Sequence, residues 1–122
     1  MLSKQNVKAY STGGLIEEVN PSVLVGHYAE EMVKNFHADI VFFSARSVDA
    51  NGEVYDVFEE ENVIRKAMIR NATVKVLLID NTKFNKTSMF HLCSLNDIDY
   101  IISNQPLPTF ETIEKMPKTI TE

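Results

Sequence analysis

A single stretch, residues 74–84 (VKVLLIDNTKF), constrains the fold more than any other, because an apolar run of strand length ends abruptly in polar residues. Five of its first six residues are apolar, and only Lys75 interrupts them. Such a run indicates a strand covered on both faces, as in a parallel sheet. Ligands of open α/β sheets bind outside the carboxyl ends of the strands. We therefore expect a ligand-binding edge at Asp80 and Lys83.

Three further segments predict the neighbours of this strand. Residues 39–45 (DIVFFSA) form a second buried run, and residues 58–71 carry glutamates in their first turn and basic residues later, which suits a helix dipole. A strand, a helix and a strand in this order make a βαβ unit with a right-handed crossover. Residues 99–103 predict one more short strand. The expected class is α/β, with a sheet that is at least partly parallel.

Other segments give weaker signals. Apolar residues at intervals of three and four predict an amphipathic helix over residues 22–36. Gly26 falls inside that helix, which suggests close packing on the sheet or on a ligand. His27 is interpreted as a surface or half-buried histidine, since no catalytic or metal-spaced partner is evident. We also expect a short strand within residues 84–95 and a short helix over residues 109–116.

A pair of glycines follows a possible first strand. Residues 7–10 are apolar enough for a short strand, and Gly13 and Gly14 close it. Adjacent glycines allow a tight turn and a close backbone approach, so the pair forms either a plain turn or the start of a ligand loop.

Polar residues also follow the second buried run. Ser44, Arg46 and Asp49 stand at its carboxyl end, where they could bind an anionic or polyhydroxylated ligand, although Arg46 and Asp49 could equally pair with each other. The segment after the central strand has an alternative as well. Asp80 could cap the following turn while Lys83 remains a solvated surface charge.

Size and composition bound the remaining possibilities. The 122 residues suit one domain over residues 1–122, with a core over 7–104 and a C-terminal tail over 105–122. A net charge of −5 argues against nucleic-acid binding by this chain alone. Cys93 is the single cysteine and stands at no metal-ligand spacing, so we expect no disulfide, metal or other cofactor. Without a membrane span or a signal peptide, the expected location is cytoplasmic.

The order of these motifs carries a resemblance. The motifs come in the order STGG, SVLVGHYAEEMVKNFHADIVFFSARSVDANGEV, EEENVIRKAMIRNA, VLLIDNTKF and LNDIDYIISN. In this order they resemble the C-terminal effector domain of DeoR-type bacterial transcriptional regulators. The resemblance covers residues 11–104.

This resemblance implies a Rossmann-like, mostly parallel sheet with flanking helices, of the ribose-phosphate isomerase and CoA-transferase type. It further implies a sensor that binds a phosphorylated sugar and controls operator binding by an attached helix-turn-helix. Many members have glycine where this sequence has Arg46-Ser47, which bears on the sugar accepted. The family motifs match the glycine turn, the loop after the second strand, the start of the following helix and the Asp-x-x-Lys segment, that is Gly13, Gly14, residues 44–52, Glu61, Asp80 and Lys83.

The resemblance also implies missing parts. Such regulators begin with a DNA-binding domain and then a strand with the first phosphate loop, so we expect this chain to be an N-terminally truncated piece that contacts DNA only through a domain it lacks. The free sheet edge predicts a homo-oligomer. A second function remains open, a sugar-phosphate isomerase that uses a carboxylate base with a lysine to stabilise an enediolate, a set that Glu61, Asp80 and Lys83 could supply. We favour the sensor, without catalytic residues.

Overall fold

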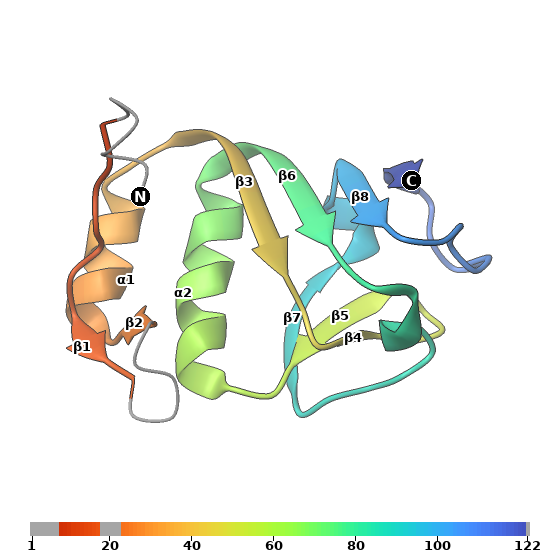
Figure 1. Ribbon diagram of the computed structural model, residues 1–122, viewed down its shortest axis with the longest axis horizontal. Coiled ribbons are helices and arrows are strands. Elements are labelled where there is room, and N and C mark those ends of the chain that lie inside the picture. The colour runs from red at the N-terminus through yellow and green to blue at the C-terminus, as the bar shows by residue number, and fades with distance from the viewer. Residues whose placement is uncertain (1–7, 18–22, 122) are drawn as a thin grey trace.

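The computed structural model describes residues 8–17 and 23–121. Its main sheet has four strands in the order β3-β6-β8-β9, namely β3 (Ala38–Ser44), β6 (Ala72–Leu78), β8 (Tyr100–Ser103) and β9 (Lys118–Thr121). All three pairings in this sheet are parallel. The predicted α/β class with a parallel sheet is therefore confirmed (Figure 1).

A smaller antiparallel sheet lies beyond the carboxyl ends of β3 and β6 (Figure 1). It consists of β4 (Ser47–Val48), β5 (Glu53–Asp56) and β7 (Phe90–Ser94). The turn between β4 and β5 has Gly52 at a φ of 78°. The strand predicted within residues 84–95 is β7, and short 3-10 helices, η2 (Asn81–Lys83) and η3 (Leu95–Asp97), precede and follow it.

Two helices pack beside the main sheet. Figure 1 shows α2 (Glu59–Arg70) between β3 and α1 (His27–Lys34), and the first turn of α2 lies at the same end of the molecule as the carboxyl end of β3. α2 forms where the sequence predicts it. Among the apolar residues of α2, Ile64 and Ala67 are buried, whereas Val63 is exposed.

The predicted helix over residues 22–36 is too long. Leu24 and Val25 form β2 (Leu24–Val25), which pairs antiparallel with β1 (Leu15–Ile16). Gly26 has a φ of 92°, so it precedes the helix as its N-cap and does not lie within it. A positive φ is incompatible with a right-handed helix, which is why α1 begins only at His27.

The ends of the chain also differ from expectation. Residues 8–10 form no strand, while the first residue of the segment predicted there lies outside the described residues. The helix predicted over residues 109–116 is absent, and the following Lys118–Thr121 is strand β9 in the main sheet. The predicted tail therefore contributes to the fold, and Phe110 within it joins the core beside Phe84.

Cover on the main sheet is uneven. Val76 and Leu77 point to opposite faces of β6 and are both buried, as predicted for the central strand. β3 is covered on one face only, because Val41 and Phe43 are buried whereas Ile40 is 46% and Phe42 is 55% exposed. β3 pairs with β6 alone among the described strands, so it is an edge strand and not the fully buried strand that its sequence suggested.

Candidate functional site

A polar cavity of about 210 Å³ lies at the carboxyl end of β3. Four of the eight residues predicted for the site line it, and they come from the end of β3, from the loop after it, from α2 and from η2. These residues are Ser44, Arg46, Glu61 and Lys83. The other lining residues are Ala45, Asp56, Phe58 and Arg65.

The parallel pairing of β3 with β6 explains how distant segments meet here. Ser44 and Leu78 are register partners at the carboxyl ends of the two strands. The loops that follow these strands therefore start side by side, which brings Arg46 and Lys83 to one cavity. A parallel bridge between Val48 and Phe84 also joins the continuing chains. The edge predicted from the apolar run is thus where the cavity is found.

Asp80 has a structural role beside this cavity and does not line it. Its Oδ1 accepts a hydrogen bond from the backbone N–H of Thr82 at 2.9 Å, so it caps η2. That hydrogen bond is the main reason why the pKa of Asp80 lies below its ordinary value, and the nearby charge of Lys83 lowers it further. The capping alternative therefore holds for Asp80, whereas Lys83 is half-buried and faces the cavity.

The wall formed by β5 and α2 carries an ion-pair cluster. The guanidinium of Arg65 donates to Oδ2 of Asp56, and its Nη2 lies 3.7 Å from Oε1 of Glu61. Asp56 and Glu61 are buried, and Arg65 is half-buried. The sequence pointed to Glu61 but not to Asp56 or Arg65. Glu61 and Arg65 are four residues apart on a helix, and that spacing was the one available signal.

Glu61 is held in an unfavourable place for a negative charge. It is 7% exposed. Burial raises the pKa of its carboxyl above the ordinary value, the charge of Arg65 lowers it, and Asp56 raises it again. The carboxyl of Glu61 lines the cavity, where its oxygens can accept a hydrogen bond from a hydroxyl group.

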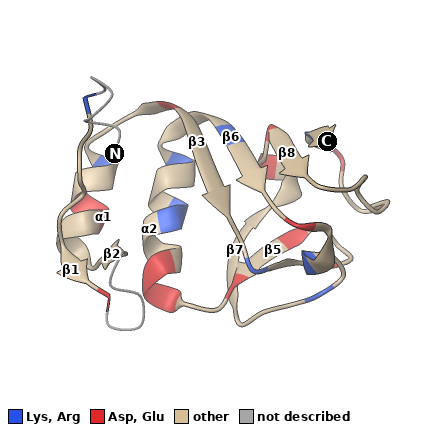
Figure 2. Cartoon of the chain, in the orientation of Figure 1, with Lys and Arg blue, Asp and Glu red and all other residues tan. Residues whose placement is uncertain are grey.

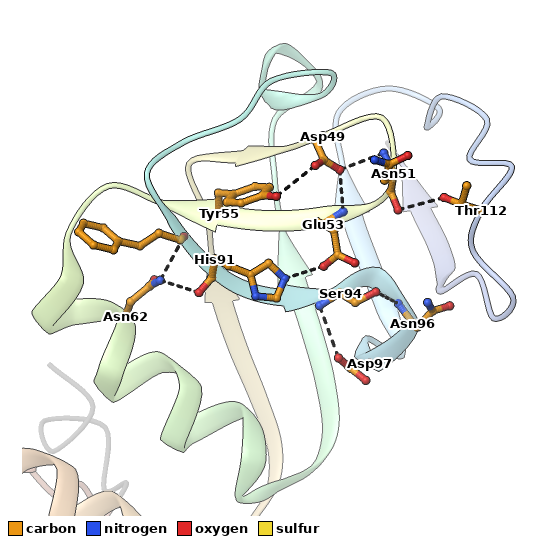
Figure 3. Close-up of polar contacts among 11 residues, drawn as sticks. Asp49, Asn51, Glu53, Tyr55, Asn62, His91, Ser94, Asn96, Asp97 and Thr112 are labelled. Carbon is orange, nitrogen blue, oxygen red and sulfur yellow. Dashed lines mark hydrogen bonds and ion pairs between the residues drawn. The ribbon is translucent and has the colours of Figure 1, made fainter.

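Asp49 serves the β4–β5 turn and does not reach the cavity. Figure 3 shows its Oδ1 accepting hydrogen bonds from the backbone N–H of Asn51 at 2.9 Å and of Glu53 at 3.0 Å. Its Oδ2 accepts from the hydroxyl of Tyr55 at 3.2 Å. The described residues contain no ion pair between Asp49 and Arg46, so the predicted alternative pairing of these two side chains does not form.

The glycine turn packs against the first helix. Gly13 has a φ of 68° and Gly14 a φ of 97°, and neither residue lines the polar cavity. A Cβ on Gly14 would lie 2.7 Å from the carbonyl oxygen of Val25 and 2.9 Å from Cβ of Ala29. Gly14 therefore packs closely against the protein's own chain, whereas a Cβ on Gly13 would meet nothing within 4 Å.

Other features of the described residues offer little chemistry. They contain no cluster of histidine, cysteine or acidic side chains suited to a metal ion, and none of their helices could cross a membrane. Burial raises the pKa of the Cys93 thiol to about 12, which leaves it unreactive. Figure 2 shows acidic residues in the first turn of α2 and basic residues further along this helix.

Comparison with known proteins identifies similar sequences. A family model described as the DeoR C terminal sensor domain matches residues 1–105. An L-fucose operon activator of Haemophilus influenzae is 31% identical over 108 residues, which are 88% of this chain and 43% of that protein. A putative aga operon transcriptional repressor of Escherichia coli O157:H7 is 26% identical over 118 residues, 97% of this chain and 43% of that protein.

A third relative is the HTH-type transcriptional repressor GlcR of Bacillus subtilis. It is 26% identical over 102 residues, which are 84% of this chain and 39% of that protein. The chain therefore spans about two fifths of the length of these curated relatives.

Proposed function

This chain belongs to the DeoR C-terminal sensor-domain family, and we propose that it binds a phosphorylated sugar in the polar cavity at the carboxyl end of β3. The observation that carries this proposal is the meeting of Arg46 and Lys83 with the buried carboxyl of Glu61 in one cavity. Guanidinium and ammonium groups bind phosphate oxygens, while carboxylates accept hydrogen bonds from sugar hydroxyls.

The names of the relatives support a carbohydrate ligand. The Haemophilus protein is named for an L-fucose operon and the Escherichia protein for an aga operon. Regulators of such operons need a signal that reports on sugar supply. A sensing role also fits a cavity in which the acidic groups are held in ion pairs. We therefore propose a domain without catalytic residues rather than an isomerase.

The partners of the domain form part of the proposal. We propose a Rossmann-like domain of the ribose-phosphate isomerase type that acts in the cytoplasm as a homo-oligomer and contacts DNA through a separate helix-turn-helix domain. Residues 1–122 carry a net charge of −5, which opposes binding to a phosphate backbone. We expect no sequence-selective binding by this chain in a gel-shift assay with the operators of sugar operons. A salt-sensitive, sequence-selective shift would contradict this expectation.

The proposed function is tested by a calorimetric and thermal-shift screen of sugar phosphates against their unphosphorylated parents. The expected result is saturable binding of one or more sugar phosphates and no binding of the parent sugars. The same samples should show no aldose–ketose conversion of the bound phosphates. If the parent sugars bind as tightly as their phosphates, the proposal that the ligand is phosphorylated is wrong. Turnover of a sugar phosphate that is lost in Glu61→Gln would favour an enzyme.

A further inference from the structure

We propose that the polar cavity accepts a sugar carrying one phosphate and discriminates against sugar bisphosphates. This inference rests on the proposed function and adds the substrate class to it. Its basis is the uneven distribution of charge around the cavity, where only two of the three cations are available to an anionic ligand.

The available cations come from the loop after β3 and from η2. Arg46 and Lys83 line the cavity, and neither forms an ion pair with a carboxylate of the described residues. The backbone N–H groups beside them are already used, because that of Arg46 donates to the carbonyl of Tyr55 and that of Lys83 to the carbonyl of Asp80. A phosphate in this cavity would therefore be bound by the two side chains and not by these N–H groups.

The third cation is already neutralised. Arg65 donates to Asp56 and lies 3.7 Å from Glu61, and each of these two carboxylate side chains is 8% exposed. Two buried carboxylates around one guanidinium give this wall of the cavity a net negative charge when both carboxyl groups are ionised. The opposing charges are little screened, because the side chains are buried.

The consequence for a ligand follows from the charges. A first phosphate placed between Arg46 and Lys83 meets two positive charges. Because the cavity holds about 210 Å³, a second phosphate on the same sugar would come close to Asp56 and Glu61. The negative charges of a second phosphate and of these carboxylates would repel strongly in a partly buried site. Hydroxyl groups at the same place carry no charge and can donate to the carboxylate oxygens.

Matched ligand pairs test this inference in the unmodified chain. Isothermal titration calorimetry would compare fructose 1-phosphate and fructose 6-phosphate with fructose 1,6-bisphosphate, and ribulose 5-phosphate with ribulose 1,5-bisphosphate. A titration with inorganic phosphate measures how much the phosphate group alone contributes to the binding free energy. In every pair with a binding monophosphate, we expect the bisphosphate to bind at least tenfold more weakly.

A charge-removing variant assigns the discrimination to the cavity. Glu61→Gln keeps the size of the side chain and removes its charge, and it should reduce the ratio of bisphosphate to monophosphate dissociation constants at least threefold. Glu60→Gln is the matched control, because Glu60 is exposed in the same turn of α2 and does not line the cavity. This control should leave the ratio unchanged, and circular dichroism would verify that both variants are folded.

The outcomes separate this inference from the proposed function. A bisphosphate that binds as tightly as its monophosphate overturns the inference, although sugar-phosphate sensing would stand. An equal change of the ratio in Glu60→Gln also overturns it, because the discrimination would then reflect the net charge of the chain. If no sugar phosphate binds at all, the proposed function fails together with the inference.

Discussion

Oε1 of Glu61 lies 3.7 Å from Nη2 of Arg65, one turn further along α2, and both side chains face the polar cavity. Folded proteins normally expose charged groups. Here the carboxyl groups of Glu61 and Asp56 are buried in the wall of the candidate site, next to Arg65. From this arrangement we expect a stability that depends on pH and a site that is selective for charge.

The first prediction concerns Glu61 and the stability of the fold. Burial raises its pKa above the ordinary value of 4.5, so the folded state binds more protons at this site than the unfolded state. The contribution of Glu61 to the free energy of unfolding is therefore fully present below pH 4.5 and is lost as the pH rises through the raised pKa. Glu61→Gln removes this dependence, because glutamine does not titrate.

Urea unfolding of the two proteins between pH 4 and pH 8 measures the effect. The difference in unfolding free energy between Glu61→Gln and the unmodified chain should shift in favour of the variant as the pH rises. Glu60→Gln should show no such trend, since Glu60 is exposed. A difference for Glu61→Gln that stays constant over this range would show that Glu61 titrates as an ordinary glutamate.

The second prediction distinguishes the two glycines of the turn. Gly13→Ala introduces a side chain into open space at a φ of 68°, which costs about 1–2 kcal/mol. Gly14→Ala combines a φ of 97° with overlap between the new Cβ and the carbonyl oxygen of Val25, which adds about 1–3 kcal/mol. Chemical denaturation should rank Gly14→Ala below Gly13→Ala in stability. Equal losses would contradict the close packing of Gly14.

The third prediction concerns association through β3. The outward face of this edge strand exposes Ile40 and Phe42, and unpaired strand edges readily add another strand. We expect light scattering at micromolar concentrations to show a dimer or a larger species. Phe42→Glu should weaken association at least tenfold, whereas Tyr28→Glu, an exposed aromatic position on α1, should not. A strict monomer would count against this expectation.

Most of the main sheet could be predicted because three of its strands are apolar in sequence. β3, β6 and β8 coincide with apolar runs, and α2 coincides with a segment of helical periodicity in which acidic residues precede basic ones. β9 could not be found in this way, since all four residues of Lys118–Thr121 are exposed and three of them are polar or charged. Its strand conformation depends on pairing with β8, which local sequence does not encode.

The candidate site was predictable only in part, for the same reason. Ser44 ends β3, and Arg46 and Lys83 come shortly after the ends of β3 and β6, so the rule for carboxyl ends of parallel strands predicts their place. Asp56 and Arg65 reach the cavity from β5 and from the middle of α2, and only the packing of the small sheet on α2 brings them there. The same rule predicted Asp49 for the site, but its carboxylate accepts hydrogen bonds from the backbone of the β4–β5 turn instead.

The most direct test of the central claim is the dissociation constant of a sugar monophosphate measured by calorimetry for four proteins. These are the unmodified chain, Arg46→Met, Lys83→Met and the control Lys86→Met. Lys86 is exposed close to Lys83 in sequence but does not line the cavity. Loss of one charge-assisted contact to phosphate, about 1.5–3 kcal/mol, corresponds to a weakening of roughly 10-fold to 150-fold.

We expect this weakening in Arg46→Met and in Lys83→Met, with binding of Lys86→Met unchanged. Binding that is as tight in Arg46→Met and Lys83→Met as in the unmodified chain would contradict the assignment of this cavity as the sugar-phosphate site.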